Sequence, residues 1–260
     1  MAAMSELTGK VAIVTGGVRG LGRQIAAALH AAGADVAITG RDAEAVTAAA
    51  DEIGPGVLPV VCDIRDEQAV DGLAPAVLDR FGRIDILVNN SGIAGPTVPL
   101  WETSPSEWRD VIDTNVLGTF LCCRAVLPTM VRQRSGSVVN IGSATGKRPI
   151  VGRTSYAASK TALIGLTRTL ATEAGPHGIR VNLVSPGAID SDRFHSVVDA
   201  MAASQGVAVA DLMREVVAGS PLGRLVRPEQ VTDVVTFLAG DGAGGITGED
   251  INVSAGLVMY

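Results

Sequence analysis

Short runs of apolar and β-branched residues alternate along the chain with segments of helical periodicity. The apolar runs cover residues 11–15, 36–39, 57–62, 84–88, 137–141, 180–184 and 250–253. Between the first two runs, Leu21, Ile25 and Leu29 repeat at helical spacing, and Gly33 follows as a stop signal. Continuous apolar runs separated by helices are typical of parallel strands covered on both faces. The pattern predicts an α/β protein with a doubly wound parallel sheet of about seven strands and helices on both faces.

One segment departs from this short alternation. Residues 190–223 carry two amphipathic stretches, one around Val198 and one around Val216, between two of the predicted strands. A connection of this length in a compact domain is often functional. Two interpretations are open, a lid over a substrate or a helical insertion packed on the core. The chain has no internal repeat and no linker rich in proline, glycine and serine, so we expect a single domain over residues 1–260.

Composition narrows the class of protein. Hydrophobic residues make up 47% of the 260 positions and charged residues 18%, which supports a sizeable core and excludes a disordered, highly charged chain. The 21 Lys and Arg residues are outnumbered by 27 Asp and Glu, which gives a net charge of −6. We therefore expect no nucleic-acid partner.

The cysteines and the lengths of the apolar runs indicate in which cellular compartment the protein is expected. Cys62, Cys122 and Cys123 are an odd count with an adjacent pair, which indicates free thiols rather than a disulfide framework. They offer no metal-ligand spacing, so no metal site is expected. The N-terminus lacks the features of a secretory signal, and no apolar run approaches the roughly 18 residues of a membrane span. We expect a cytoplasmic protein without a membrane partner.

A glycine-rich turn follows the first predicted strand and opens the first predicted helix. Gly16, Gly17, Gly20 and Gly22 form the pattern G-G-x-x-G-x-G. Glycines in such a turn let the backbone approach a pyrophosphate, whose charge the N–H groups of the helix start stabilise. This spacing differs from the usual G-x-G-x-x-G, but its position after the first strand favours nucleotide binding over a purely structural turn.

A second candidate site lies in a later helical segment. Tyr156 and Lys160 are four residues apart, so they share one helix face. A tyrosine has an ordinary pKa near 10, and a neighbouring ammonium lowers it toward the range of an acid–base catalyst. An isolated pair of this kind is more often a surface tyrosine beside a solvated lysine. Its combination with the glycine turn favours catalysis.

Taken together, these motifs resemble those of the short-chain dehydrogenase/reductase family. The resemblance runs from about residue 7 to about residue 256. It is closest to the 3-oxoacyl reductase branch of the family. Its motifs occur in order as Thr15 with Gly16, Gly20 and Gly22, then Asp63, the run 89–92, Asn115, Ser143, Tyr156 with Lys160, and Pro186 with Gly187. Ser91 stands where the family usually has alanine, and Ser191 stands where it often has threonine. The implied fold is a Rossmann-type domain.

The resemblance also implies roles for individual residues. Tyr156 would exchange a proton with the substrate oxygen, Lys160 would lower its pKa and bind the nicotinamide ribose, Ser143 would hydrogen-bond the substrate oxygen, and Asn115 would hold a water that links Lys160 to solvent. The implied cofactor contacts are Gly16, Arg19, Gly20, Leu21, Gly22, Arg41, Asp63, Ile64, Asn90, Tyr156, Lys160, Pro186, Gly187 and Ser191. The substrate pocket would be lined from Ala144, Thr145, Ile150, Val151, Arg193 and Phe194.

Two arginines predict the preferred cofactor. Enzymes that select NAD place a carboxylate at the end of the second strand, whereas the 2′-phosphate of NADP requires a cation. Here Gly40 is neutral, Arg41 follows it, and Arg19 lies in the glycine turn. Asp42 precedes a helical pattern and is expected to cap that helix, and Asp63 would contact the adenine. We therefore expect NADP(H) to be preferred, with NAD(H) possible.

These inferences combine into a functional hypothesis. We expect an NADP(H)-dependent oxidoreductase that interconverts a ketone and a secondary alcohol, similar to 3-oxoacyl reductases. A sugar, polyol or xenobiotic alcohol dehydrogenase with the same catalytic residues is the alternative. A nucleotide-sensing regulator without turnover would be expected to lack Tyr156 or Lys160, and both are present. The resemblance further implies a homotetramer, and the apolar terminus 257–260 favours burial against another subunit.

Overall fold

A seven-stranded parallel sheet forms the centre of the molecule, whose computed structural model describes residues 7–260. The strands are β1 (Val11–Val14), β2 (Asp35–Gly40), β3 (Leu58–Val61), β4 (Ile86–Asn89), β5 (Gly136–Ile141), β6 (Ile179–Pro186) and β7 (Asp250–Val253). Their order is β3-β2-β1-β4-β5-β6-β7. All seven predicted strands are confirmed, with bounds that differ by up to two residues. The sixth extends to Pro186 because its last four residues pair with β7.

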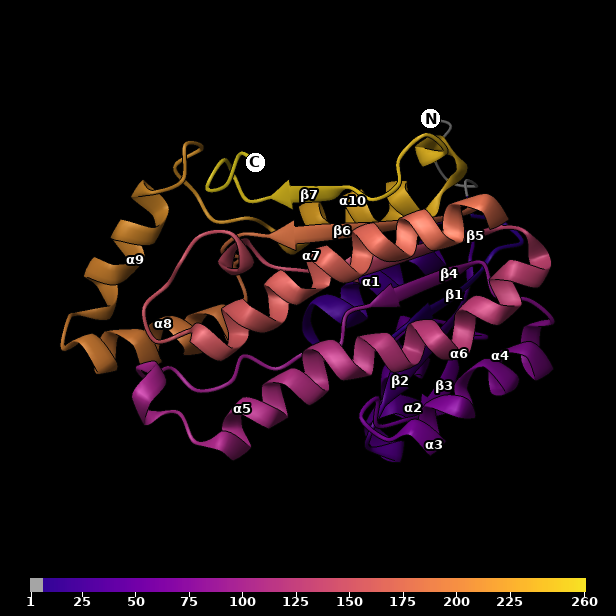
Figure 1. Ribbon diagram of the computed structural model, residues 1–260, viewed down its shortest axis with the longest axis horizontal. Helices are drawn as coiled ribbons and strands as arrows, with labels where there is room; N and C mark the ends of the chain where they lie inside the picture. The colour runs from indigo at the N-terminus through magenta and orange to yellow at the C-terminus, as the bar shows by residue number, and fades with distance from the viewer. Residues whose placement is uncertain (1–6) are drawn as a thin grey trace.

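Helices cover both faces of the sheet, as predicted (Figure 1). One face packs against α1 (Gly20–Ala31), α2 (Ala43–Ile53) and α10 (Pro228–Ala239). The other packs against α3 (Glu67–Asp71), α4 (Leu73–Phe81), α6 (Gly118–Gln133) and α7 (Thr154–Ala174). Each face of the sheet carries one cluster of buried apolar side chains. Neighbouring residues of a strand belong to opposite clusters, as Ala12 and Ile13 of β1 do, because their side chains alternate across the sheet. Asp42 accepts a hydrogen bond from Ala45 N and caps α2, which confirms its predicted role.

A single long helix passes from the loop after β4 to β5. It joins α5 (Pro105–Ile112), a π-helical turn (Asp113–Leu117) and α6 over 29 residues. Its most apolar stretch of 18 residues has a mean hydropathy of 1.3, so the helix is long and apolar enough to cross a membrane by length and composition alone. Half of its most apolar stretch is buried inside the protein, where Leu121, Val126 and Met130 contact the sheet cluster. Its apolar character is therefore explained by packing on the sheet.

The segment 190–223 contains two helices. α8 (Asp192–Gln205) and α9 (Val209–Ala218) lie at the end of the molecule toward which the arrows of β6 and β7 point (Figure 1). They share a small cluster of their own, made by Val198, Ala202 and Leu212, which is separate from the two sheet clusters. Both predicted amphipathic stretches are thus helical. Closure of this segment over a substrate stays a prediction.

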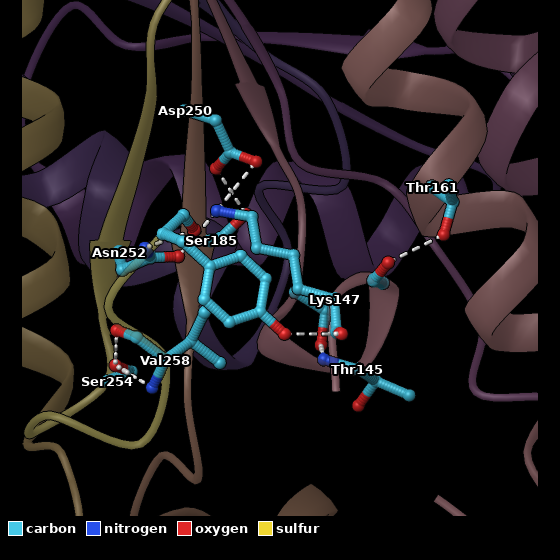
Figure 2. A network of polar contacts seen from close by, with 11 residues as sticks. Thr145, Lys147, Thr161, Ser185, Asp250, Asn252, Ser254 and Val258 are labelled. Carbon is cyan, nitrogen blue, oxygen red and sulfur yellow. Dashed lines mark hydrogen bonds and ion pairs between the residues drawn. The ribbon is translucent and has the colours of Figure 1, made fainter. Parts of the chain in front are cut away.

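A buried ion pair fastens the loop after β5 to the last two strands. Lys147 Nζ lies 2.7 Å from Asp250 Oδ2, and each side chain is only 7% exposed. Ser185 donates its hydroxyl proton to Asp250 Oδ1 over 2.6 Å, and Lys147 also donates to Asn252 Oδ1. Figure 2 shows Lys147 reaching Asp250 beside Ser185 and Asn252. The loop is therefore held to the edge of the sheet by an ion pair that is buried away from solvent.

Three further hydrogen bonds complete the attachment of this loop. Tyr260, at the end of the chain, donates its hydroxyl proton to Lys147 O over 3.1 Å, and Asn252 donates to Tyr260 O over the same distance. On the other side, Thr161 of α7 donates to Gly146 O over 2.7 Å (Figure 2). The loop from Ser143 to Lys147 is thus fixed between α7 and the C-terminal end of the chain.

We predict that Lys147→Met destabilises the protein by about 3–5 kcal/mol, because the Asp250 carboxylate is left buried without its cation. Urea unfolding measures the change. The double variant Lys147→Met with Asp250→Leu removes both charges and should recover most of the loss. Lys10→Met is the matched control, since the Lys10–Asp241 pair has one side chain 86% exposed and should contribute less than about 1 kcal/mol. A Lys147→Met variant as stable as the unmodified protein would contradict this role.

Candidate active site

Glycine shapes the loop between β1 and α1. Gly16 and Gly20 have φ of +64° and +55°, the left-handed region that other residues rarely adopt. A Cβ added to Gly22 would lie 2.2 Å from Gly16 O and 2.3 Å from Asn90 Nδ2, so only glycine fits. A Cβ added to Gly20 would meet no atom within 4 Å. The loop thus leaves open space at the first turn of α1, and its residues fit the pyrophosphate of a dinucleotide.

The segment that follows β4 holds this glycine loop in place by hydrogen bonds. Thr15 Oγ1 accepts hydrogen bonds from Asn90 N and Ser91 N, both over 3.0 Å. Asn90 Nδ2 in turn donates to Thr15 O over 3.0 Å. A Cβ on Gly16 would lie 2.8 Å from Ser91 Oγ. The first strand was predicted to include Thr15, but β1 ends at Val14. The side chain of Thr15 instead joins the glycine loop to the run 89–92.

The residues predicted to select the cofactor meet beyond β2 and β3. Arg41 follows Gly40, and its charge helps to lower the pKa of Asp63, although the main cause is hydrogen bonding from Arg65. Arg65 NH2 lies 2.8 Å from Asp63 Oδ2. Arg19 and Arg41 are exposed, and within residues 7–260 neither has a carboxylate at ion-pair distance. Both guanidinium groups are therefore available to an anion.

The four predicted catalytic residues come from three elements. Tyr156 and Lys160 lie one turn apart on α7, and Lys160 Nζ is 5.8 Å from the centre of the Tyr156 ring. Lys160 is buried and donates a hydrogen bond to Ile141 O, at the end of β5, over 2.7 Å. Ser143 follows the same strand; its hydroxyl accepts a hydrogen bond from Thr145 N over 3.1 Å and helps to lower the pKa of Tyr156. The structure therefore brings Ser143, Tyr156 and Lys160 together.

The electrostatics of this cluster favour the ionised form of the tyrosine. Burial raises the pKa of Tyr156, but Lys160, Arg193, the hydrogen bond with Ser143, and Arg153 together outweigh burial and lower it. Burial also lowers the pKa of Lys160, which Tyr156 opposes and Arg193 reinforces. The result is a phenol whose pKa lies below its ordinary value of about 10. Such a group can give or take a proton near neutral pH more readily than a free tyrosine.

Asn115 lies in the π-helical turn between α5 and α6. Its Oδ1 accepts a hydrogen bond from Ile93 N over 2.8 Å, and its Nδ2 donates to Ile93 O and to Ser159 Oγ, both over 3.0 Å. Its side chain therefore ties the loop after β4 to α7, close to Lys160. π-helical turns of this kind are frequent at functional sites. Its implied role toward a water molecule stays a prediction.

The remaining predicted cofactor residues line the same edge of the sheet. Pro186 ends β6, and a Cβ on Gly187 would lie 2.8 Å from Ser254 Cα, so glycine is needed there. Ser191 caps α8 by accepting a hydrogen bond from Phe194 N. Leu21 lies half-buried in the first turn of α1, and Ile64 is buried after β3, against Gly118.

Sequence reasoning missed one residue of this site, Arg153. Its guanidinium carbon lies 4.8 Å from the centre of the Tyr156 ring. The residue is only 5% exposed, which its charge does not lead one to expect. Its position three residues before Tyr156 is the one signal in the sequence, because residues at this spacing share a helix face.

Comparisons with known proteins agree with this geometry. A sequence model of a family, described as Enoyl-(Acyl carrier protein) reductase, matches residues 16–258. The chain is 36% identical to a 3-oxoacyl-[acyl-carrier-protein] reductase of Escherichia coli, over 96% of this chain and 98% of that protein. The crystal structure of NAD+-bound xylitol dehydrogenase has a TM-score of 0.93 at 30% identity and covers 97% of this chain and 100% of that one.

A further solved structure, of an actinorhodin polyketide ketoreductase variant with NADPH, has a TM-score of 0.92 at 33% identity. It covers 98% of this chain and 100% of that one. These similarities extend over nearly the whole chain and include both the glycine loop and the segment of Tyr156 and Lys160. The chain belongs to the short-chain dehydrogenase/reductase family, whose members are NAD(P)-dependent oxidoreductases acting on small carbonyl and alcohol substrates.

Proposed function

We propose that this protein is an NADP(H)-dependent oxidoreductase that interconverts a ketone and a secondary alcohol, with 3-oxoacyl compounds as the first class to test. The observation that carries the proposal is the cluster of Ser143, Tyr156 and the buried Lys160, in which the pKa of the phenol is lowered. The name of the relative from Escherichia coli supports the choice of 3-oxoacyl compounds.

The roles of these residues follow from their chemistry. The nicotinamide cofactor, when bound, supplies or accepts a hydride. In reduction, the hydroxyl of Tyr156 donates its proton to the carbonyl oxygen while Ser143 donates a hydrogen bond to the same atom. In oxidation, the phenolate of Tyr156 removes the proton of the alcohol. The Lys160 ammonium favours that phenolate, since opposite charges attract strongly where water is excluded.

The alternative is a sugar or polyol dehydrogenase, which the likeness to xylitol dehydrogenase supports. A substrate panel decides between the two. The purified protein is assayed with NADPH on 3-oxoacyl thioesters, simple ketones and ketoses, and with NADP+ on polyols. Faster reduction of 3-oxoacyl compounds supports the proposal, and faster oxidation of polyols supports the alternative. Cofactor binding without turnover of any compound would instead indicate a nucleotide sensor.

We predict that Tyr156→Phe lowers kcat by a factor on the order of 100 to 10,000, because the variant has no acid at the substrate oxygen. The dissociation constant of NADPH should change little, since the ring is retained. Lys160→Ala should lower kcat and also weaken the binding of NADPH, because Lys160 is assigned a ribose contact as well. Steady-state kinetics and cofactor fluorescence titration measure the two effects. Unchanged turnover in Tyr156→Phe would refute the catalytic assignment.

The pH dependence of alcohol oxidation should report the lowered pKa of Tyr156. Oxidation requires the phenolate, so kcat/KM should rise with pH and level off above a midpoint below about 10. In Lys160→Ala the ammonium that lowers the pKa of Tyr156 is missing, while burial still raises that pKa. The midpoint should therefore move to higher pH. Lys160→Arg keeps the charge and serves as the control. A midpoint that is the same in both variants would exclude Lys160 as its cause.

The cofactor preference is proposed from Arg19 and Arg41, whose guanidinium groups have no intramolecular carboxylate partner in the part of the chain that the structure describes. They flank the end of β2, where the 2′-phosphate of NADP would lie. Replacing Gly40 with aspartate is not a clean test, because a Cβ there would lie 2.4 Å from Val18 Cγ2. Substitution of the arginines themselves avoids this collision.

We predict that Arg41→Ala and Arg19→Ala each raise the KM for NADPH by about tenfold or more, since each removes charge-assisted hydrogen bonds to the phosphate. The KM for NADH should change little. Arg23→Ala is the control, because Arg23 is also exposed on α1 but pairs with Glu52. An unmodified enzyme with a higher kcat/KM for NADH would contradict the proposed preference.

The homotetramer is proposed from the edge strand β7 and the end of the chain. The terminus folds back on its own subunit, with Val258 buried, yet Met259 is 76% and Tyr260 81% exposed. We predict that light scattering at micromolar concentration gives four times the chain mass of 26.5 kDa. Met259→Asp should lower that mass by weakening apolar burial between subunits. A monomeric unmodified protein would refute the assembly.

A further inference from the structure

Arg153 is a buried cation without a carboxylate partner. It is 5% exposed, and its NH1 donates a hydrogen bond to Thr97 Oγ1 over 3.2 Å. Within residues 7–260, no Asp or Glu lies at ion-pair distance from it. A buried charge is costly unless it is paired, so unpaired burial of an arginine calls for an anion from outside the chain. Its guanidinium lies against the ring of Tyr156, which places that requirement at the catalytic centre.

A second guanidinium reaches the same centre from α8. Arg193 NH1 donates to Gly92 O over 3.1 Å, in the loop after β4. Gly92 adjoins the catalytic cluster, since a Cβ there would lie 3.1 Å from Asn115 Oδ1 and 3.6 Å from Lys160 Nζ. No carboxylate in the described part of the chain pairs with Arg193 either. Three cations, Arg153, Lys160 and Arg193, therefore surround one phenol.

This is more positive charge than proton transfer at Tyr156 needs. Lys160 alone supplies a fixed ammonium one helical turn away. Arg153 and Arg193 come from different elements, the start of α7 and the start of α8, and they repel each other. Guanidinium groups have several donors in a planar fork that suits a carboxylate, and each of these two is seen to use only one of them, toward a neutral oxygen. An anionic substrate group would pair with the buried Arg153, and the exposed Arg193 would bind the same group.

We propose that the substrate carries a carboxylate one methylene away from the reacting carbonyl, so that the enzyme acts on a 3-oxo acid and the corresponding 3-hydroxy acid, with Arg153 and Arg193 as the residues that bind the carboxylate. This inference rests on the proposed ketone reduction and narrows its substrate class. A 3-oxoacyl thioester or ester presents a neutral group at the same place, so it leaves both guanidinium groups unpaired. The charge of the substrate thus becomes the property that the site selects.

The test compares substrates that share the 3-oxobutanoyl group and differ in whether its carboxyl group is charged or esterified. The rate of NADPH oxidation is measured with 3-oxobutanoate, with its methyl ester and with its N-acetylcysteamine thioester. The unmodified enzyme should favour the acid by at least tenfold in kcat/KM. In Arg153→Met and Arg193→Met this preference should fall toward one, mainly through a higher KM for the acid. Arg168→Met is the matched control, because Arg168 is an exposed arginine on α7, and it should leave the preference unchanged.

Other outcomes separate this inference from its rivals. Arginines that serve only to lower the pKa of Tyr156 would, on substitution, slow acid and ester equally and shift the pH profile, which would overturn the proposal. A change confined to the KM for NADPH in Arg193→Met would assign Arg193 to the cofactor and overturn its role here. An unmodified enzyme that prefers the ester or thioester would overturn the charged-substrate class while leaving ketone reduction in place.

A binding measurement keeps the two proposals distinguishable. Calorimetry follows the binding of butanoate and of neutral butanamide to the protein with NADP+. Butanoate should bind at least tenfold more tightly than butanamide, and Arg153→Met should abolish the difference. If no carbonyl compound is reduced but this difference is present, the proposed function fails and the anion site stands. If the difference is absent and the acid is not preferred, the anion site fails.

Discussion

A buried ammonium held beside a half-buried phenol is the interaction on which the rest of the structure depends. Lys160 keeps its place because Ile141 O, at the end of β5, accepts its hydrogen bond over 2.7 Å. The helix α7 then fixes Tyr156 one turn away, with Ser143 opposite. Because the ammonium is buried and the phenol is half-buried, their mutual attraction is stronger than it would be at the surface. Neither the helix nor the strand alone would produce a tyrosine with a lowered pKa.

The sheet topology explains why the cluster of Ser143, Tyr156 and Lys160 and the glycine loop share one edge. The order β3-β2-β1-β4 reverses the direction of winding at β1, and the crevice beyond the carboxyl ends of the strands is where such folds bind ligands. The junction of Thr15 with Asn90 spans that point. The loop after β5 is fixed from the other side by the Lys147–Asp250 pair, and so the hydroxyls of Ser143 and Tyr156, which we propose as catalytic, are positioned from both halves of the sheet.

Local patterns in the sequence predicted much of this arrangement. The β-branched runs identified all seven strands, because buried parallel strands leave a continuous apolar signature, and Asp42 was predicted as a helix cap from the pattern that follows it. The glycine turn and the Tyr156–Lys160 spacing carried the family resemblance. Arg153 and the Lys147–Asp250 pair were not predicted. Their burial results from packing between segments far apart in the chain, as the separation of Lys147 from Asp250 illustrates, and single-sequence periodicity carries no information on such contacts.

The most direct test of this account is a spectroscopic titration of Tyr156 itself. The chain has two tyrosines, so Tyr260→Phe leaves Tyr156 as the one phenol whose ionisation changes the near-ultraviolet absorbance. The difference between this variant and the Tyr156→Phe, Tyr260→Phe double variant isolates that signal. The account predicts a midpoint below the ordinary value of about 10, rising when Lys160 is replaced by alanine. A midpoint at or above 10 that does not respond to Lys160 would contradict it.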